Sequence, residues 1–364
     1  MNIPYIVGVE TAVPPYCVQQ SDVRDFVHAL FREQYHGIER LMTVFENTQI
    51  QTRYFSAPLS WFSEQQGFVQ SNAAYIETAL NISADASYRL LQRHGVRADD
   101  VEMIIAVSTT GIATPSLDGK LIQRLKLRAS TRRMPVWGLG CAGGVAGLAR
   151  TAELVGSLLT GKYALMVAVE LCSLTFQRND VSKSNIVASS LFADGAAAVL
   201  VRSQEALEQV PERSSETTPK TALLQICGSY SHLFDNSEDI MGWDIIETGL
   251  KVRFSRDIPT LIRQHLPSLL EQATASWGVR REDLKHYVVH AGGAKVLQAY
   301  QDLGIPRTQL EPAYSVLRHY GNMSSVSVLF ALREFLAHTP PTGELGLMMA
   351  LGPGFSAEFI LFRW

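Results

Sequence analysis

The stretch GLGCAGGVAG, residues 138–147, places a single cysteine, Cys141, among glycines. Glycine permits a tight backbone and the close approach of a neighbouring group. The apolar residues that follow predict a helix, so Cys141 stands at a helix N-terminus, where the helix dipole favours a thiolate. Free cysteine is also common as a small, inert core residue. The glycines and the helix start favour a nucleophile over a core residue.

The segments around this stretch follow a plan that occurs twice. An acidic turn, an apolar strand and small residues occupy 99–111 and again 282–293. A small-residue helix start, an apolar helix and a buried strand occupy 140–170 and again 321–352. Strands without alternating polar residues indicate sheets covered on both faces. A helix that is apolar nearly all round indicates burial between layers. We therefore predict a layered α/β protein with two pseudo-equivalent halves.

Two pairs of residues that are equally far apart in the sequence support the duplication. Thr109 and Cys141 are 141 − 109 = 32 positions apart, and His290 and Asn322 are 322 − 290 = 32 positions apart. We expect Thr109 and His290 to end equivalent strands, and Cys141 and Asn322 to begin equivalent helices. If the two central helices meet, Cys141 lies near His290 and Asn322. Taken singly, the histidine also fits a structural, hydrogen-bonded residue, and the asparagine an N-cap.

The polar segment 203–222, rich in Ser, Thr, Glu and Pro, predicts an exposed connection between the halves. We therefore expect an N-terminal half over 1–215 that carries Cys141, and a C-terminal half over 216–364 that carries the histidine and the asparagine. Residues 20–95 have mostly helical patterns and are expected to form outer helices.

Composition excludes several classes of function. The 364 residues are 46% hydrophobic and carry a net charge of −3, so no basic field favours nucleic acid as a partner. No apolar run reaches the roughly 18 residues of a membrane span, and the N-terminus lacks the features of a signal peptide. The four cysteines, Cys17, Cys141, Cys172 and Cys227, show no CxxC pairing, so we expect neither a metal site nor a disulfide framework. A cytoplasmic location fits best.

Five motifs in order resemble those of type III polyketide synthases, the chalcone-synthase-like branch of the thiolase superfamily. They are GCAGG (140–144), LFADGAAAVLV (191–201), VVHAGGAKVL (288–297), YGNMSSVSVLFAL (320–332) and LGPGFSAEFIL (351–361). The resemblance implies a thiolase-like layered αβαβα fold and a homodimer. It also implies malonyl-CoA and an acyl-CoA starter as substrates, with no metal and no further cofactor.

The resemblance implies a catalytic triad of Cys141, His290 and Asn322. Cys141 would attack an acyl-CoA thioester and hold the starter. His290 and Asn322 would donate hydrogen bonds to the enolate that forms when malonyl-CoA loses CO2. Phe192 matches the family phenylalanine beside the triad, where an aromatic wall disfavours a charged carboxylate.

The resemblance also assigns positions around the substrate. Those matching the family's elongation cavity are Thr109, Thr110, Cys172, Thr175, Gly242, Val252 and Ser324, with Leu351, Gly352, Pro353 and Gly354 in the loop that shapes the cavity. Arg53 lies in a segment that resembles the family's basic CoA-contact region.

The chain departs from plant members at four positions: Cys172 replaces a threonine, Thr114 a methionine that reaches across the dimer, and Val252 and Leu351 phenylalanines. The last two changes widen an apolar cavity. They favour medium- to long-chain fatty acyl-CoA starters and alkylpyrone or alkylresorcinol products.

Phe176 and Trp243 would oppose that widening if either fills the space. The alternative is then a malonyl-primed enzyme with a small, closed cavity.

Two other functions remain open at this point. A β-ketoacyl carrier-protein synthase III shares the fold and the Cys–His–Asn set, but its motifs usually read HQAN and GNTSAAS, whereas this chain has HAGG and GNMSS. A non-catalytic partner subunit tends to lose the cysteine, which this chain keeps. The basic segment 120–133 would contact CoA phosphates or a carrier protein, although a solvated helix face is the favoured interpretation.

Overall fold

The computed structural model describes residues 2–159, 161–205, 224–255, 257–337 and 343–364. Within these residues, nine strands form one sheet in the order β11-β12-β13-β8-β1-β7-β6-β4-β5. Their bounds are β1 Asn2–Ala12, β4 Val101–Val107, β5 Arg132–Val136, β6 Tyr163–Leu171, β7 Asp194–Glu205, β8 Leu224–Leu233, β11 Leu284–Val289, β12 Leu345–Gly352 and β13 Ser356–Arg363. Strand β8 joins the two parts of the sheet by a short pairing with β1.

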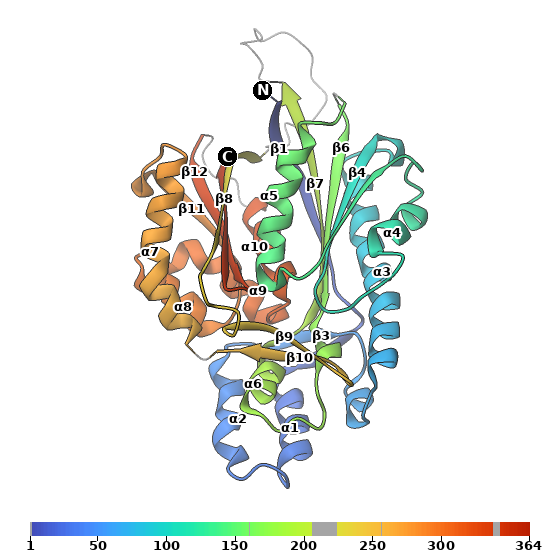
Figure 1. Ribbon diagram of the computed structural model, residues 1–364, viewed down its shortest axis with the longest axis vertical. Coiled ribbons are helices and arrows are strands. Elements are labelled where there is room, and N and C mark those ends of the chain that lie inside the picture. Colours follow the sequence, from blue (N-terminus) through green and yellow to red (C-terminus); the bar gives the residue numbers. More distant parts are fainter. Residues whose placement is uncertain (1, 160, 206–223, 256, 338–342) are drawn as a thin grey trace.

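The helices give the molecule its layers (Figure 1). Helices α5 (Gly143–Val155) and α10 (Ser327–Leu336) lie between the two parts of the sheet. Helices α3 (Phe68–Arg93) and α4 (Leu117–Leu125) cover one outer face, and α7 (Ile258–Ser276) and α8 (Ala294–Asp302) cover the other. Helix α9 (Glu311–Tyr320) packs against α10. The order helix, sheet, helix, sheet, helix is the one predicted.

Close packing at the molecular centre explains the glycines around Cys141. A Cβ at Gly144 would lie 2.1 Å from the carbonyl oxygen of Ser325, and one at Gly147 would lie 2.6 Å from Cγ2 of Val107. Larger residues would push α5 away from α10 and from the sheet. The two central helices therefore meet, as the duplication predicted.

The duplication is correct in plan but one predicted equivalence is wrong. The central helices begin at 143 and 327, and 327 − 143 = 184, so Ser325, not Asn322, occupies the position equivalent to Cys141. Asn322 lies three residues earlier. The connections differ: α4 and β5 lie between β4 and α5, whereas α8 and α9 lie between β11 and α10. The equal separations of 32 positions therefore do not reflect equal structure.

A smaller apolar unit lies at one end of the layers (Figure 1). It contains α1 (Gln20–Phe31), α2 (Ile38–Asn47), α6 (Lys183–Leu191), and the hairpin of β9 (Met241–Ile246) and β10 (Gly249–Phe254). Strands β2 (Tyr16–Gln19) and β3 (Thr52–Phe55), together with the 3₁₀ helix η1 (Leu59–Ser63), complete it. The expected outer helices of 20–95 are thus present, and α1 and α2 bury apolar faces in this unit.

The predicted boundary at 215/216 and most of the predicted connection 203–222 lie outside the described residues, so the division of the chain stays a proposal. Within the described residues, no helix combines the length and the hydropathy that crossing a membrane requires.

Candidate active site

Cys141 lies in the 3₁₀ turn η3 (Gly140–Ala142), directly before α5, and is 8% exposed. The backbone of Gly140 has φ +47°, and a Cβ there would lie 2.6 Å from Cδ of Pro353. A Cβ at Gly352 would lie 2.6 Å from the Cβ of Ala142. The predicted cavity loop 352–354 therefore packs directly on the turn that carries the cysteine.

The side chain of Asn322 is hydrogen-bonded to the loop after β11 and is linked to Cys141 through Ser324. Its Oδ1 accepts a hydrogen bond from the backbone N–H of Ser324 at 2.8 Å, and its Nδ2 donates to the carbonyl of Gly292 at 3.1 Å. The hydroxyl of Ser324 in turn donates to Sγ of Cys141 at 3.6 Å. Ser324, which the sequence placed only on the cavity wall, thus connects the asparagine with the cysteine.

His290 directly follows β11 and is 4% exposed. Its backbone N–H donates to the carbonyl of Met349 at 3.1 Å. A Cβ at Gly292 would lie 3.2 Å from Cδ2 of the imidazole, so the ring lies over the same glycine that Asn322 contacts. In the described part of the chain, Nδ1 of the ring has no hydrogen-bond partner. The structure therefore brings the three predicted residues to one place, through Ser324 and Gly292.

Burial sets the charge states of the cysteine and the histidine. It raises the pKa of Cys141 to about 11 and lowers the pKa of His290 to about 4. Burial thus disfavours the charged form of both groups, whereas the helix N-terminus favours the thiolate of Cys141.

Glu170, a residue that the sequence reasoning missed, holds the turns on both sides of Cys141. It is 0% exposed near the end of β6. Its Oε2 accepts from the N–H of Thr109 at 3.0 Å and from the hydroxyl of Thr110 at 2.9 Å, and its Oε1 accepts from the hydroxyl of Ser325 at 2.6 Å. Thr109 Oγ1 accepts from the N–H of Gly140 at 3.1 Å. The two threonines, predicted as cavity lining, thus fix the backbone beside the cysteine.

Phe192 is joined to Asn322 by a parallel β-bridge. The N–H of Asn322 donates to the carbonyl of Leu191, and the N–H of Ala193 donates to the carbonyl of Asn322, both at 2.9 Å. The ring of Phe192 lies 6.5 Å, centroid to centroid, from that of Trp243. The predicted aromatic wall is therefore attached to the asparagine through the backbone.

Sequence profiles of a known family match nearly the whole chain. The profile for the N-terminal domain of chalcone and stilbene synthases matches residues 3–205, and the profile for the C-terminal domain of the same family matches residues 225–364. The chain belongs to the chalcone and stilbene synthase family. It is therefore a type III polyketide synthase, an acyltransferase that condenses malonyl-CoA units.

Individual relatives and a solved structure agree with this family. A putative chalcone synthase of Bacillus subtilis (strain 168) is 38% identical over 367 residues, 99% of this chain and 98% of the relative. A 1,3,6,8-tetrahydroxynaphthalene synthase of Streptomyces peucetius subsp. caesius is 36% identical over 99% of this chain and 93% of its own length. The crystal structure of the Streptomyces coelicolor A3(2) enzyme of that name matches with a TM-score of 0.88 at 27% identity, over 99% of both chains. The predicted thiolase-like fold is confirmed.

The other predicted cavity positions of this type III polyketide synthase lie on four elements. Cys172 begins the turn after β6 and is 2% exposed, and the hydroxyl of Thr175 donates to its carbonyl at 2.8 Å. Val252 in β10 pairs with Trp243 in β9. Gly242 lies beside Trp243, and a Cβ there would meet only Nη2 of Arg253, at 4.0 Å. Leu351 is buried near the end of β12, 8% exposed.

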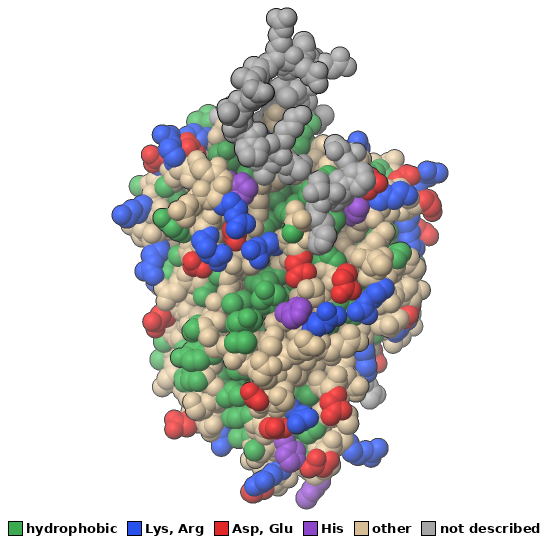
Figure 2. Space-filling model, turned by 180° about the vertical axis from the view of Figure 1, so that it is seen from behind, with side chains coloured by type: hydrophobic (Ala, Val, Ile, Leu, Met, Phe, Trp, Pro, Cys, Tyr) green, Lys and Arg blue, Asp and Glu red, His purple; other side chains and the backbone are tan. Residues whose placement is uncertain are grey.

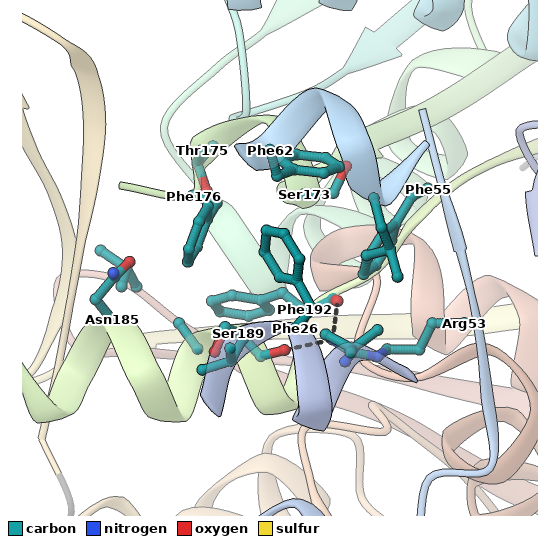
Figure 3. Close-up of a pocket in the computed structure, with 15 residues that line it drawn as sticks. Phe26, Arg53, Phe55, Phe62, Ser173, Thr175, Phe176, Asn185, Ser189 and Phe192 are labelled. Carbon is teal, nitrogen blue, oxygen red and sulfur yellow. Dashed lines mark hydrogen bonds between the residues drawn. The ribbon is translucent and has the colours of Figure 1, made fainter. Parts of the chain in front are cut away.

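The expected contact between Arg53 and CoA is wrong, because the side chain of Arg53 is 0% exposed. Its Nη1 donates to the carbonyls of Ser189 at 2.7 Å and Phe192 at 2.8 Å, the dashed bonds of Figure 3. Burial lowers its pKa to about 9, a shift that the nearby Asp194 opposes. Arg53 thus holds the end of α6 and the backbone of the aromatic wall, and it cannot reach a phosphate in solvent.

The basic segment 120–133 is not one helix face, because α4 ends at Leu125 and Arg132 and Arg133 belong to β5. Arg133 pairs with Asp118 at 2.6 Å and Arg132 with Glu102 at 3.6 Å, and both arginine side chains are partly exposed. Among the residues that the structure describes, no group of three or more His, Cys, Asp or Glu side chains is placed to hold a metal ion.

Proposed function

We infer that Cys141, His290 and Asn322 form the catalytic triad of this polyketide synthase. The observation that carries this proposal is their convergence through Ser324 and Gly292 beside the N-terminus of α5. His290 takes the thiol proton of Cys141, and the sulfur attacks the starter thioester and displaces the CoA thiol. The starter acyl group is then held on Cys141.

Chain extension uses the same residues. The carboxyl carbon–carbon bond of malonyl-CoA breaks, CO2 leaves, and the electron pair forms an enolate. His290 and Asn322 donate hydrogen bonds to the enolate oxygen, and one such donor is worth about 3 kcal/mol, roughly a hundredfold in rate or more. Phe192 keeps the site apolar, which disfavours the carboxylate and favours its loss. The carbanion attacks the acyl carbon on Cys141, and the sulfur leaves as the thiolate.

The test separates the two roles. Cys141→Ala should abolish starter-dependent product, because no covalent acyl group forms. His290→Ala and Asn322→Ala should each slow the release of CO2 from malonyl-CoA on the order of a hundredfold. Unchanged CO2 release in either variant would remove that residue from the mechanism, and starter-dependent product from Cys141→Ala near the wild-type rate would remove the nucleophile.

The proposed starter is a medium- to long-chain fatty acyl-CoA, cyclised after extension to an alkylpyrone or alkylresorcinol. Val252 supports this, because it places a small, partly buried apolar side chain beside the aromatic wall. The catalytic efficiency with acyl-CoA starters of increasing length, in wild type and in Val252→Phe, tests the proposal. Efficiency that falls steadily with length in wild type would contradict it, and an unchanged length profile in Val252→Phe would exclude Val252 from the wall.

A malonyl-primed synthase with a compact product is the second candidate. Trp243 lies opposite Val252 in the hairpin and near Phe192, where its indole takes up space that the valine leaves. Two of the similar proteins are tetrahydroxynaphthalene synthases, named for a product without an alkyl chain. Mass spectrometry of products from malonyl-CoA alone, compared with malonyl-CoA plus acyl-CoA, decides between the candidates.

A homodimer and a cytoplasmic location complete the proposal. Strand β5 is an edge of the sheet, and Ile112 and Trp137 nearby are each 50% exposed. The indole of Trp137 is fixed by a hydrogen bond to the carbonyl of Gly111. Hydrophobic side chains also gather on the rear face (Figure 2). All four cysteines are free, which fits a reducing compartment.

A further inference from the structure

The loop that packs on the turn of Cys141 is held from its other side by one serine. Ser237 lies in the connection between β8 and β9 and is 4% exposed. Its Oγ donates to the carbonyls of Phe234 and Gly354, each at 2.6 Å, and accepts from the backbone N–H of Phe355. The hydroxyl therefore binds both polar groups of the peptide that joins Gly354 to Phe355.

The connection between β8 and β9 packs closely on the same peptide. A Cβ at Gly354 would lie 2.7 Å from Cδ1 of Leu233, and the rings of Phe234 and Phe355 stack with their centroids 5.4 Å apart. Phe355 is 2% exposed, so without the hydroxyl of Ser237 its N–H would lose an acceptor in a buried place. A buried group without a partner is costly, and the loop can lower that cost by moving. Loss of the hydroxyl therefore acts first on the loop.

The opposite side of the loop lies on the turn that carries Cys141. Pro353 packs against Gly140, and Gly352 packs against Ala142, at distances where neither glycine has room for a Cβ. The loop is thus clamped between this turn and the connection that contains the serine. A shift of the loop would remove the packing that holds the turn, and it would change the orientation of the cysteine side chain.

We propose that Ser237 is a positioning residue for the condensation reaction. By fixing the peptide between Gly354 and Phe355, its hydroxyl keeps the loop against the turn and keeps Cys141 in the orientation from which the sulfur reacts. The inference rests on the proposed function, in which Cys141 is the nucleophile. Displacing a reacting group by about 1 Å can lower the rate about a hundredfold. All partners of the hydroxyl are backbone groups and none holds CoA, so the loss should lie in kcat and not in KM.

Two variants of equal shape isolate the hydroxyl. Ser237→Thr keeps it and Ser237→Val replaces it with a methyl group, so any effect of added bulk is common to both. Release of CoA gives kcat and KM for malonyl-CoA, with the acyl-CoA starter that wild type uses fastest. Thr274→Val is the control, because Thr274 is also 4% exposed and its hydroxyl donates to backbone carbonyls within α7. We expect kcat of Ser237→Val to be about 10- to 100-fold below that of Ser237→Thr, and Thr274→Val to keep the wild-type kcat.

Alkylation by iodoacetamide gives a second measurement that does not depend on the starter. Cys141 is 8% exposed, and withdrawal of the loop removes a packed neighbour, so Ser237→Val should be alkylated at Cys141 faster than Ser237→Thr. Cys172 is 2% exposed and should show no such difference, whereas a general loosening of the fold would raise both rates. Mass spectrometry of the peptides measures the two rates separately.

The outcomes distinguish this inference from the proposed function. Equal kcat in Ser237→Thr and Ser237→Val, a loss that lies only in KM, or equal acceleration of alkylation at both cysteines would overturn the role of Ser237. Starter-dependent product from Cys141→Ala would instead overturn the proposed nucleophile. If Ser237→Val does not fold, Ser237→Ala removes the hydroxyl without added bulk, and the same measurements against wild type decide.

Discussion

The buried carboxyl group of Glu170 should make stability depend on pH. Burial raises its pKa to about 7 from an ordinary value of 4.5, although hydrogen bonds from Ser325, Thr109 and Thr110 oppose the shift. Because the folded protein holds this proton more tightly than the unfolded chain, the stabilisation is complete below pH 4.5 and is lost as the pH rises through 7. The free energy of unfolding that is lost between low and high pH is about 3 kcal/mol, and about 2 kcal/mol of this loss occurs between pH 5.5 and 8.

Glu170→Gln removes this dependence while keeping the shape of the side chain. The amide oxygen can accept from Thr109 and Thr110, and the amide N–H can donate to the hydroxyl of Ser325, which then accepts. The free energy of unfolding of the variant, minus that of wild type, should therefore increase by about 2 kcal/mol from pH 5.5 to 8. The assay is urea denaturation of both proteins at fixed concentration and several pH values.

A surface substitution provides the control for this measurement. The side chain of Glu153 is 47% exposed, so Glu153→Gln removes a carboxylate charge that is not buried. The free energy of unfolding of Glu153→Gln, minus that of wild type, should change by no more than a few tenths of a kcal/mol between pH 5.5 and 8. If the Glu170→Gln difference is equally independent of pH, the carboxyl of Glu170 is ionised throughout, and the reasoning from burial is refuted.

Two further predictions follow from the buried arginine and the sheet edge. Arg53→Met should lower the free energy of unfolding by about 2–6 kcal/mol, because the carbonyls of Ser189 and Phe192 each lose a buried donor. Arg53→Lys should restore part of the lost stability. Equal stability of the Met and Lys variants in urea denaturation would show that the two hydrogen bonds contribute nothing. Light scattering of the wild type at micromolar concentration should give the mass of a dimer. Trp137→Glu should shift the measured mass toward that of a monomer, because it places a charge in the expected contact between the two protomers. A monomeric wild type would exclude the homodimer.

The fold could be predicted because its determinants are local in the sequence. Apolar strands and central helices that begin with small residues recur in both halves, and glycines such as Gly144 in α5 have a packing reason that the structure shows. The meeting of Cys141, His290 and Asn322 follows from the same pattern, although their roles remain predictions. The offset of three residues between the halves could not be predicted, because it depends on the different connections before α5 and α10.

Arg53 shows where a motif misleads and where a signal was available. The resemblance of its segment to a CoA-contact region implied a phosphate contact, yet burial alternates along β3, so that Arg53 and Phe55 are buried and Thr52 and Tyr54 are partly exposed. The alternation of a strand places Arg53 on the same face as the phenylalanine. This alternation in the segment TRYF was a signal that the prediction did not use.

Glu170 and Asp194 were missed for a different reason. Each is a single carboxylate beside an apolar strand, and its partners are distant in sequence: Ser325 for Glu170, and Ser56 and Ser173 for Asp194. Burial of a charge requires such partners, but a sequence without its fold does not identify them. The only signal was an acidic residue at one end of an otherwise apolar run, near the last residue of β6 for Glu170 and at the first residue of β7 for Asp194.

The orientation of the Asn322 amide determines what it can do for the reaction. Because Oδ1 accepts from a backbone N–H, that of Ser324, the amide nitrogen must occupy the other position, where one of its two hydrogens goes to Gly292. The second hydrogen is left to donate, which is the requirement for stabilising an enolate oxygen. Ser324 achieves this with φ +49°, a conformation that costs a non-glycine residue about 1–3 kcal/mol. In that conformation one residue points its N–H at Asn322 and its hydroxyl at Cys141. The two hydrogen bonds of Ser324 therefore position Cys141, the proposed nucleophile, relative to Asn322, the proposed donor.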